Sequence, residues 1–389
     1  MAIRSPSLSA WRSLSRLVGV AALFMGSLLP SAYAESGVSA DEILLGQSTA
    51  LTGPLAELGN DTSIASKAYF DYVNAQGGIN GRKIRLITLD DGYDTDKGVA
   101  NARQLIEKDG VFALFNVLGT PANIALIPVI TRAGIPHIAP FSGSESVRKP
   151  FNRFMFHVRA SYADETEKII EHLGVRGIER IAIVYQNNGF GKDGLAGAEK
   201  ALAKRDLKPH ATAAIENDAS DAAKAAATLA ESGPKAVLMI TAGKPSAEFI
   251  KAYNKIAPGM QFFALSVMGT QASVTALGRE GIGVVVSQVA PFPFSATSNI
   301  VREYQQIMTK MGVKNWSFAS MEGFLNAKVA VEGLKRAGRD LTRERFMSAL
   351  ESMNKLDFDG YAVNFSKTSH QGSRYVELTV ISRDGRFLR

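Results

Sequence analysis

The 389-residue sequence contains no cysteine, and this absence excludes several kinds of site. Disulfide bonds, cysteine-ligated metals and a lipoprotein anchor, which needs a cysteine to acylate, are all ruled out. Stability in an oxidising compartment must then come from core packing. Histidine is scarce as well, and none of the five shows HxH or HExxH spacing; they are His137, His157, His172, His210 and His370. We therefore expect no metal and no cofactor.

Apolar runs long enough to cross a membrane are also missing. The apolar stretch at residues 17–29 is shorter than the roughly 20 residues that a membrane span needs. It follows three arginines and precedes Ala32-Tyr33-Ala34, with small residues where a signal peptidase reads the chain. This order is typical of a secretory signal peptide. We therefore expect export, with cleavage after Ala34.

Charge of one sign is not concentrated in any segment. The formal net charge is +7, and removal of the three arginines of the signal segment leaves +4. Lys and Arg are scattered among Asp and Glu, which is typical of a solvated surface and not of a nucleic-acid-binding face. We therefore expect no nucleic-acid partner.

Short apolar runs alternate regularly with amphipathic segments. This alternation predicts parallel sheets with helices on both faces. It is interrupted near residue 160 and then restarts, and the roughly 355 residues that follow the signal are enough for two cores. Strands are predicted at 111–115, 135–139, 181–185, 236–240 and 261–266, and helices at 121–133, 191–205, 218–231 and 244–256.

The C-terminal part follows a different pattern. Residues 283–291 form a β-branched run that ends in Pro-Phe-Pro-Phe and starts no strand–helix unit. Two consecutive independent domains would leave the helices that follow without a sheet to cover, so we favour lobes joined by several crossings. The later elements are predicted as helices at 299–310, 319–337 and 342–352 and strands at 361–365 and 375–381.

Three motifs occur in order at the start of the mature chain. They are Gly53-Pro54 with Gly59, then Gly77-Gly78-Ile79-Asn80-Gly81, then Asp90-Asp91. In this order they resemble the start of the leucine/isoleucine/valine-binding family of periplasmic proteins, which are type I solute-binding proteins of ABC importers. The resemblance covers nearly the whole mature chain. It implies an α/β fold with two Rossmann-like lobes, parallel sheets and a central cleft.

The resemblance also implies three crossings between the lobes. After the signal peptide at 1–34, lobe one would comprise 35–159 and 289–365, and lobe two 160–288 and 366–389. The implied role is capture of a small molecule, an amino acid or other carboxylate, for the membrane permease of an ABC importer. We expect a periplasmic monomer that is not an enzyme. A ligand sensor of the same fold is the alternative.

Loops of lobe one supply the first set of site candidates. In parallel α/β sheets ligands lie beyond the carboxyl ends of the strands, near helix N-termini. Thr120 is predicted to cap a helix that starts at Pro121, and Ser142 and Glu145 have capping-box spacing. In the resembled family the matching loops hold the ligand carboxylate. The lobe-one candidates are Leu55, Glu57, Leu118, Gly119, Thr120, Phe141, Ser142, Gly143 and Ser144.

Lobe two should supply the covering surface. Phe190 stands where the family usually has a Tyr, and it could sandwich an apolar ligand body against Phe141, although a core role under the loop is the alternative. The lobe-two candidates are Tyr185, Asn187, Phe190, Gly243, Ser266 and Val267.

One departure from the family pattern bears on the ligand. Members that bind α-amino acids place an acidic residue after the strand that matches 261–266, whereas this chain has no carboxylate there until Glu280. Burial of an ammonium without a counter-charge is costly. A branched-chain or related amino acid therefore competes with aromatic or aliphatic acids that lack the ammonium. Glu57 could substitute as the acidic partner.

Two patterns suggest other functions. Residues 189–194 spell G-x-G-x-x-G between a strand and a helix, which is the spacing of a dinucleotide site. Three residues separate the strand from the first glycine, however, and exported proteins rarely meet dinucleotides. A hydrolase that uses Ser142 with a distant histidine is also disfavoured, because the chain has no G-x-S-x-G elbow.

Overall fold

The computed structural model describes residues 1–2, 35–314 and 316–389. The predicted signal peptide lies almost entirely outside the described residues, as does its cleavage site after Ala34. None of the described helices combines the length and the apolar character that a membrane crossing requires. The described residues from 35 onward belong to one compact unit with two main sheets. We call each sheet with the helices that pack on it a lobe.

Lobe one contains a parallel sheet with the strand order β2-β1-β3-β4-β5. Alternate residues of its strand β1 face different cores. Ile43 and Leu45 pack with α2 and α11, whereas Leu44 packs with α3 and α4. The early elements of this lobe are β1 (Glu42–Thr49), α2 (Ala56–Asn74), β2 (Lys83–Asp90), α3 (Thr95–Glu107), β3 (Ala113–Phe115), α4 (Thr120–Ala133), β4 (His137–Ile138), η1 (Glu145–Val147) and β5 (Met155–Phe156).

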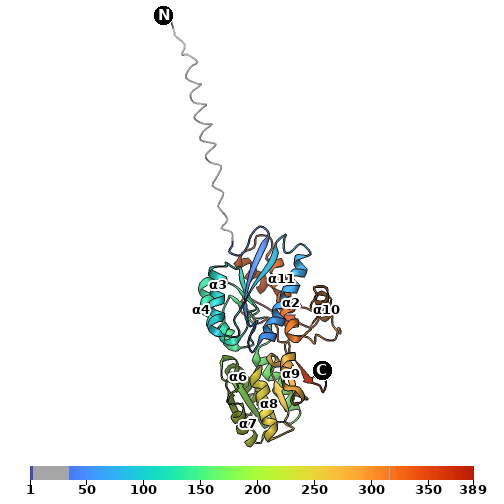
Figure 1. The fold of residues 1–389 in the computed structure, drawn as a ribbon. Coiled ribbons are helices and arrows are strands. Elements are labelled where there is room, and N and C mark those ends of the chain that lie inside the picture. The colour runs from blue at the N-terminus through green and yellow to red at the C-terminus, as the bar shows by residue number, and fades with distance from the viewer. Residues whose placement is uncertain (3–34, 315) are drawn as a thin grey trace. The chain divides into compact units, whose positions relative to one another are not determined.

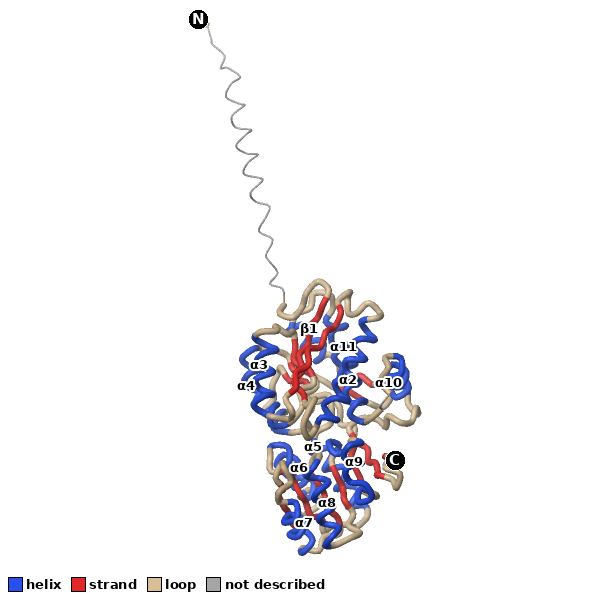
Figure 2. The backbone as a smooth tube through the Cα atoms, in the orientation of Figure 1, coloured by secondary structure: helices blue, strands red, loops and turns tan. Residues whose placement is uncertain are grey.

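Lobe two contains a sheet with the order β14-β13-β10-β9-β8-β6-β7, in which β13 and β14 run antiparallel to their neighbours. Helices cover both faces (Figure 2). Its first elements are α5 (Tyr162–Val175), β6 (Ile181–Gln186), α6 (Gly189–Ala203), β7 (Ala211–Ile215), α7 (Ala222–Glu231), β8 (Ala236–Ile240) and α8 (Lys244–Ile256). Its later elements are β9 (Phe262–Ala264), η2 (Ser266–Met268), α9 (Gln271–Leu277), η3 (Gly278–Gly281), β10 (Val285–Gln288), β13 (Glu377–Ile381) and β14 (Phe387–Leu388).

The C-terminal helices return to lobe one. In Figure 1 the orange α10 and α11 lie in the same half as the blue α2, far from α6, α7 and α8. Their buried side chains join the core that contains β1 and α2. These late elements are α10 (Asn299–Lys310), α11 (Phe318–Ala337), α12 (Arg343–Glu351), β11 (Leu356–Asp357) and β12 (Ala362–Val363).

A close contact fixes α11 against α2. A Cβ atom added to Gly323 would lie 2.3 Å from the carbonyl oxygen of Thr62, so only glycine permits this approach. The hydroxyl of Ser66 donates to the carbonyl oxygen of Gly323 at 2.9 Å. The residue before Gly323, Glu322, is therefore held in a defined position.

Segments that connect the lobes pair with each other. Residues His157 and Gln371 form a parallel bridge, and the N–H of Gly372 donates to the carbonyl oxygen of His157 at 2.7 Å. Among the described residues the chain leaves the lobe-one sheet after β5, rejoins the lobe-one core after β10 and enters the lobe-two sheet again at β13. The division of the lobes at residues 159, 289 and 366 stays a prediction.

The predicted parallel α/β architecture is confirmed, but several predicted boundaries are wrong. The helices predicted at 244–256 and 299–310 have those bounds, whereas α7 begins only at Ala222. Strands β3 and β4 are shorter than predicted because their ladder joins only two residue pairs. The predicted strand 261–266 stops at Ala264, since Ser266 begins the turn η2. The predicted strands 361–365 and 375–381 shorten in the same way to Ala362–Val363 and Glu377–Ile381.

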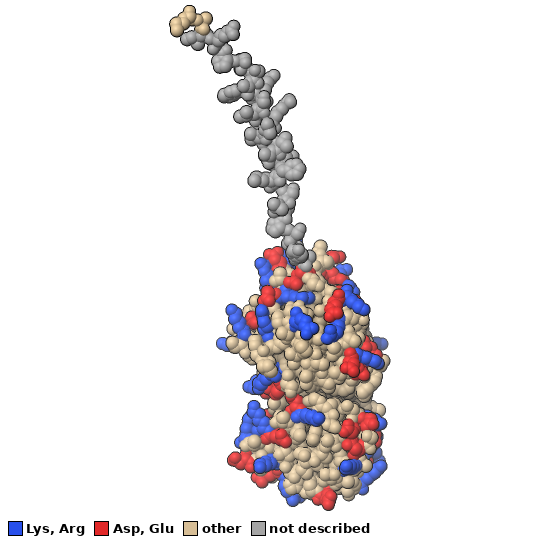
Figure 3. Space-filling view, turned by 90° about the vertical axis from the view of Figure 1, so that its left-hand side faces the viewer, with Lys and Arg blue, Asp and Glu red and all other residues tan. Residues whose placement is uncertain are grey.

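Mixed charge covers the visible surface. On the face shown in Figure 3, Lys and Arg are interspersed with Asp and Glu over both lobes. This agrees with the scattered charges of the sequence.

Candidate functional site

A small cavity lies where the two lobes meet the segments that connect them. Its free volume is about 10 Å³, which is about the space that one water molecule needs. The lining comes from α2, η2, β10, α11 and the segments after β4, β5 and β10. It consists of Leu58, Phe141, Arg159, Ser266, Val267, Gly269, Gln288, Val289, Ala290, Phe318, Ala319 and Glu322.

Arg159 is the cation of this cavity. Its Nη2 donates to Glu165 Oε1 at 3.0 Å and to Ser266 Oγ at 2.6 Å. The guanidinium also lies over the ring of Phe141, 5.1 Å from the centroid, in the cation–π range. Burial alone would lower the pKa of Arg159, but the charges of Glu322 and Glu165 together raise it above its usual value. The side chain is therefore charged and fixed in direction.

Glu165 anchors Arg159 from lobe two. It is fully buried, and its Oε2 accepts hydrogen bonds from the N–H of Ser266 at 2.8 Å and from the hydroxyl of Ser287 at 2.6 Å. Both of its oxygens thus have close donors. Such charge-assisted bonds are the strong ones in a buried network.

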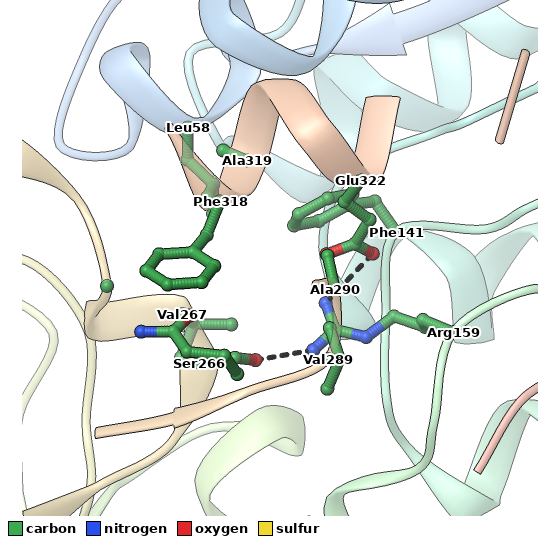
Figure 4. A pocket seen from close by; sticks show the side chains of 12 residues that line it. Leu58, Phe141, Arg159, Ser266, Val267, Val289, Ala290, Phe318, Ala319 and Glu322 are labelled. Carbon is green, nitrogen blue, oxygen red and sulfur yellow. Dashed lines mark hydrogen bonds and ion pairs between the residues drawn. The ribbon is translucent and has the colours of Figure 1, made fainter. Parts of the chain in front are cut away.

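Glu322 reaches the cavity from α11. Its Oε1 lies 3.4 Å from Nη1 of Arg159, and its side chain is as buried as that of Arg159. Burial raises the pKa of Glu322 to about 7, although the charge of Arg159 opposes the rise. Figure 4 shows the guanidinium and this carboxylate pointing into the same space, with Phe318 and Val267 on the opposite side.

Apolar side chains form the remaining walls. Leu58, Phe141 and Ala319 belong to a small buried cluster of their own, separate from the main cores. Phe318 joins the lobe-two core although it begins α11, a lobe-one helix. The cavity thus combines a buried ion pair with apolar walls, as ligand sites commonly do.

Three polar atoms around the cavity have no hydrogen-bond partner within the described part of the chain. They are Arg159 Nε, Glu322 Oε1 and Gln288 Oε1. Buried polar atoms are nearly always paired, so such atoms call for an explanation. Two of the three are acceptors. A bound ligand with hydrogen-bond donors would satisfy these two acceptors, Glu322 Oε1 and Gln288 Oε1.

The lobes also touch each other at two further places. The Asp193 carboxylate on α6 accepts from the hydroxyls of Ser144 at 2.7 Å and Ser146 at 2.8 Å, and from the N–H groups of Glu145 and Ser146. Glu57 on α2 accepts from the N–H of Ala272 at the start of α9. The structure thus has the lobes in contact, in a closed arrangement.

Three of the residues predicted from the sequence line the cavity, namely Phe141, Ser266 and Val267. Leu55, Glu57 and Gly243 instead line a neighbouring groove between the lobes, which Val267 also borders. Leu118 lies in the small buried cluster with Phe141. The predicted ligand contacts themselves stay predictions.

The predicted caps around Thr120 and Ser142 are wrong. Helix α4 begins at Thr120 after Gly119, whose φ of 100° disfavours a side chain. Thr120 is thus the first helical residue and does not cap, and its hydroxyl instead forms a 2.8 Å hydrogen bond with that of Ser142. The predicted Ser142–Glu145 capping box is replaced by Ser144, which caps η1 by accepting from the N–H of Ser146. The carbonyl of Gly143 accepts from the N–H of Tyr162 at 2.7 Å.

The lobe-two candidates lie at different depths. Phe190 is buried in the lobe-two core, where it packs edge-to-face on Tyr162 with centroids 5.0 Å apart. This position matches the core alternative and not a sandwich with Phe141. Tyr185 packs partly buried against the same core, and the exposed Asn187 donates to Glu216 at 2.7 Å.

Two of the three glycines of the G-x-G-x-x-G motif, Gly191 and Gly194, have a packing role. A Cβ on Gly191 would lie 1.9 Å from the carbonyl oxygen of Gln186, and one on Gly194 would lie 2.5 Å from Ile240. Asn188 caps α6 at the motif's start by accepting from the N–H of Gly191. The spacing is therefore explained by close packing of α6 on β6 and β8.

Sequence reasoning missed Arg159, Gln288 and Glu322. A signal for Glu322 was present, because it is the one charged residue between Ser317 and Lys328 in a segment predicted to be helical. Such an isolated charge in an apolar run suggests a buried functional group. Nothing in the local sequence indicated that it would meet Arg159.

Comparisons with known proteins agree over nearly the whole chain. The family model described as "Periplasmic binding protein" matches residues 42–386. The substrate-binding periplasmic protein from Ralstonia solanacearum is 30% identical with a TM-score of 0.82, and the match covers 89% of this chain and 99% of that one. A possible leucine/isoleucine/valine-binding protein from Rhodopirellula baltica SH 1 is 28% identical with a TM-score of 0.84, covering 92% and 98%.

A curated relative supports the same family. Leu/Ile/Val-binding protein homolog 8 from Brucella suis biovar 1 (strain 1330) is 23% identical over 391 residues, which cover 94% of this chain and 95% of the relative. Together with the two parallel-sheet lobes and the cavity between them, the family match leads to one conclusion. The chain belongs to the periplasmic binding proteins, as a type I substrate-binding protein of the leucine/isoleucine/valine-binding group.

Proposed function

We propose that this protein captures a small carboxylate with an apolar body, an amino acid of the branched-chain or a related type, and presents it to the permease of an ABC importer. It acts in the periplasm as a monomer and catalyses no reaction. The observation that carries the proposal is the buried guanidinium of Arg159, which faces a largely apolar cavity between the lobes.

Arg159 suits a carboxylate for a physical reason. A guanidinium donates strong charge-assisted hydrogen bonds to a carboxylate. Nη2 of Arg159 already donates to Glu165 and Ser266, but its Nε has no partner among the described residues and is free to donate. Leu58, Phe141, Val267 and Phe318 offer apolar surface beside it. Sugars would need many paired polar side chains, which this lining does not offer.

Capture requires the lobes to separate. A free volume of about 10 Å³ is far below that of any amino acid, so entry needs hinge opening around the connecting segments. A ligand favours closure only by contacting the closed form better than the open one. Contacts such as Asp193 with Ser144 would then form again around the ligand.

Thermal shift against amino acids, aromatic acids and aliphatic acids is the direct test, with calorimetry on every compound that raises the melting temperature. We expect a dissociation constant near micromolar, about −8 kcal/mol. Stabilisation by sugars or polyamines alone would contradict the proposal, and turnover of a bound compound would contradict the non-enzymatic role. Uptake measured with and without the protein separates transport from the alternative role of ligand sensor.

A further inference from the structure

We propose that Arg148 is a positioning residue, which ties Arg159 to the loop that contacts lobe two and so keeps the cavity in its closed geometry. The inference rests on the proposed function, because Arg159 is the residue assigned there to the ligand carboxylate. Arg148 itself is not among the residues that line the cavity. It would therefore act through Arg159 and the loop, and not by contact with the ligand.

The guanidinium of Arg148 joins two separate segments of the chain. The first is the β4 loop (139–144), and the second is the β5 segment (157–161), which leads from β5 to α5. Its Nη1 donates to the carbonyl oxygens of Ser142 at 3.3 Å and Ser144 at 3.1 Å. Its Nη2 donates to the carbonyl oxygen of Arg159 at 3.0 Å. Each terminal nitrogen thus serves one segment.

The partners of this cation are unusual. A buried arginine is normally paired with a carboxylate, as Arg159 is. Within the described part of the chain the buried guanidinium of Arg148 bonds only main-chain carbonyls, whereas Glu145 pairs with Lys149 at 2.6 Å. Burial lowers the pKa of Arg148 to about 10, so the side chain stays charged at neutral pH. Charged bonds from a rigid fork fix the direction of the carbonyls that accept them.

Both segments carry groups that the closed site needs. The β5 segment carries Arg159, whose guanidinium points into the cavity (Figure 4). The β4 loop carries Phe141, whose ring centroid lies 5.1 Å from that guanidinium. It also carries Ser144, whose hydroxyl donates across the lobes to Asp193 at 2.7 Å. One buried side chain therefore connects the cavity cation with the contact between the lobes.

The β4 loop also packs directly against the start of α5. The N–H of Tyr162 donates to the carbonyl oxygen of Gly143 at 2.7 Å. A Cβ atom on Gly143 would lie 2.5 Å from the Tyr162 ring, so the two segments approach closely. A shift of the β4 loop would therefore move the beginning of α5, which directly follows the β5 segment. A site whose parts are fixed before binding avoids the cost of ordering them when the ligand arrives.

The test uses a second arginine as a matched control. Arg343 donates from Nε to the carbonyl oxygen of Phe112 and from Nη2 to that of Val111, both at 2.9 Å. These carbonyls precede β3, whereas the cavity lining follows β4 and β5, beyond the other edge of the sheet. Arg148→Lys and Arg343→Lys both replace a two-pronged fork by a single ammonium, which has no second nitrogen for a second partner. Arg148→Met, an uncharged side chain of similar length, is the further variant if Arg148→Lys fails to fold.

The first measurement needs no ligand. NMR spectra of the arginine side-chain Nε–H groups are recorded on the full mature protein, and Arg159→Lys identifies the signal of Arg159 by its loss. We expect this signal to shift or broaden in Arg148→Lys, because the main chain of Arg159 loses its support. It should stay in place in Arg343→Lys, although both variants should melt at a lower temperature than the wild type.

The second measurement is calorimetry with leucine and phenylalanine. For an amino acid that the wild type binds, affinity should fall about tenfold or more in Arg148→Lys, since binding must then order the β4 loop and Arg159. Affinity should be unchanged in Arg343→Lys. A merely structural arginine would lower the melting temperature and leave both the Arg159 signal and the affinity as they are.

The outcomes separate the two proposals. An unchanged Arg159 signal or an unchanged affinity in an Arg148 variant with a cooperative melt overturns the positioning role, as do equal effects of Arg343→Lys. Both results leave the carboxylate-binding function standing. Failure of the wild type to bind either amino acid counts against the proposed ligand, and the Arg159 signal then decides the role of Arg148 alone.

Discussion

Glu322 Oε1 lies 3.4 Å from Nη1 of Arg159, inside a cavity that both lobes line. The two residues come from distant parts of the chain, and each is held by its own support. Arg159 is held by Glu165 and Ser266, and Glu322 is held by the close packing of α11 on α2 at Gly323. This pair motivates the first three predictions below.

Replacement of Glu322 by Gln should stabilise the ligand-free protein at high pH. Burial raises the folded-state pKa of Glu322 from 4.5 to about 7. The stability that this group contributes is therefore complete below pH 4.5 and is lost as the pH rises through 7. A shift of this size corresponds to about 3 kcal/mol. Denaturant unfolding measures this. The unfolding free energy of Glu322→Gln, taken relative to that of the wild type, should rise by about 3 kcal/mol between pH 4.5 and pH 8. A difference that does not change with pH would contradict the prediction.

Affinity for an amino acid should fall on acidification. The proposed amino-acid ligand carries an ammonium, which an ionised Glu322 in the cavity lining would attract, and burial raises the pKa of this carboxyl to about 7. Arg159, Glu165 and Arg148 also act on Glu322. The pKa of Arg159 is raised and that of Arg148 is lowered only to about 10, so neither arginine titrates near 7. We expect about a tenfold loss of affinity between pH 8 and pH 6. Calorimetry on wild type and Glu322→Gln tests this, since the variant should show a nearly flat profile. If affinity changes with pH in the same way in the wild type and in Glu322→Gln, the pH effect comes from another group.

Removal of Arg159 should damage both stability and binding. An Arg159→Met variant leaves Glu165 and Glu322 buried without their cation, which typically costs about 3–5 kcal/mol of unfolding free energy. Adding Glu322→Gln should recover part of that loss, because one stranded charge is removed. Chemical denaturation of the two single variants and the double variant measures the coupling. Strictly additive losses would show that the two residues do not interact.

Asp193 should control closure without touching the ligand. Its carboxylate accepts from Ser144, Glu145 and Ser146 on the other lobe. Asp193→Ala should therefore weaken binding by about 1.5–3 kcal/mol, the range for hydrogen bonds to a charged group. Small-angle scattering should show a more extended ligand-free protein. Lys192→Ala, an exposed change on the same helix, is the control and should leave both measurements unchanged.

Gly323→Ala should lower stability and affinity together. The added Cβ would lie 2.3 Å from the Thr62 carbonyl oxygen, so α11 must shift and carry Glu322 with it. Overpacking of this kind typically costs about 1–3 kcal/mol. Gly174→Ala is a matched control, because its Cβ would meet only Arg205, at 3.8 Å. Thermal melts and calorimetry on both variants test the prediction. An affinity loss without loss of stability would mean that the contact does not hold α11.

Local sequence signals were sufficient for much of the fold and pointed to three residues of the cavity lining, Phe141, Ser266 and Val267. The apolar run at 236–240 and the amphipathic segment at 244–256 have the predicted bounds, because neighbouring residues decide them. Strand β7, at the sheet edge and only partly buried, was not predicted, because it lacks a continuous apolar pattern. The predicted caps at Thr120 and Ser142 were wrong because α4 starts at Thr120 itself, after Gly119, and η1 starts only at Glu145, after Ser144.

The sequence by itself determined the parallel α/β architecture, the family and the loops that border the cleft, because these follow from short-range periodicity and from motifs in order. Only the tertiary structure decided which charges meet in the cavity. Arg159 follows β5 and Glu322 lies on α11, and they become neighbours because α11 returns from the C-terminal part to pack on α2. No local pattern encodes that meeting, since it depends on how separate elements pack and on one glycine that lets two helices approach.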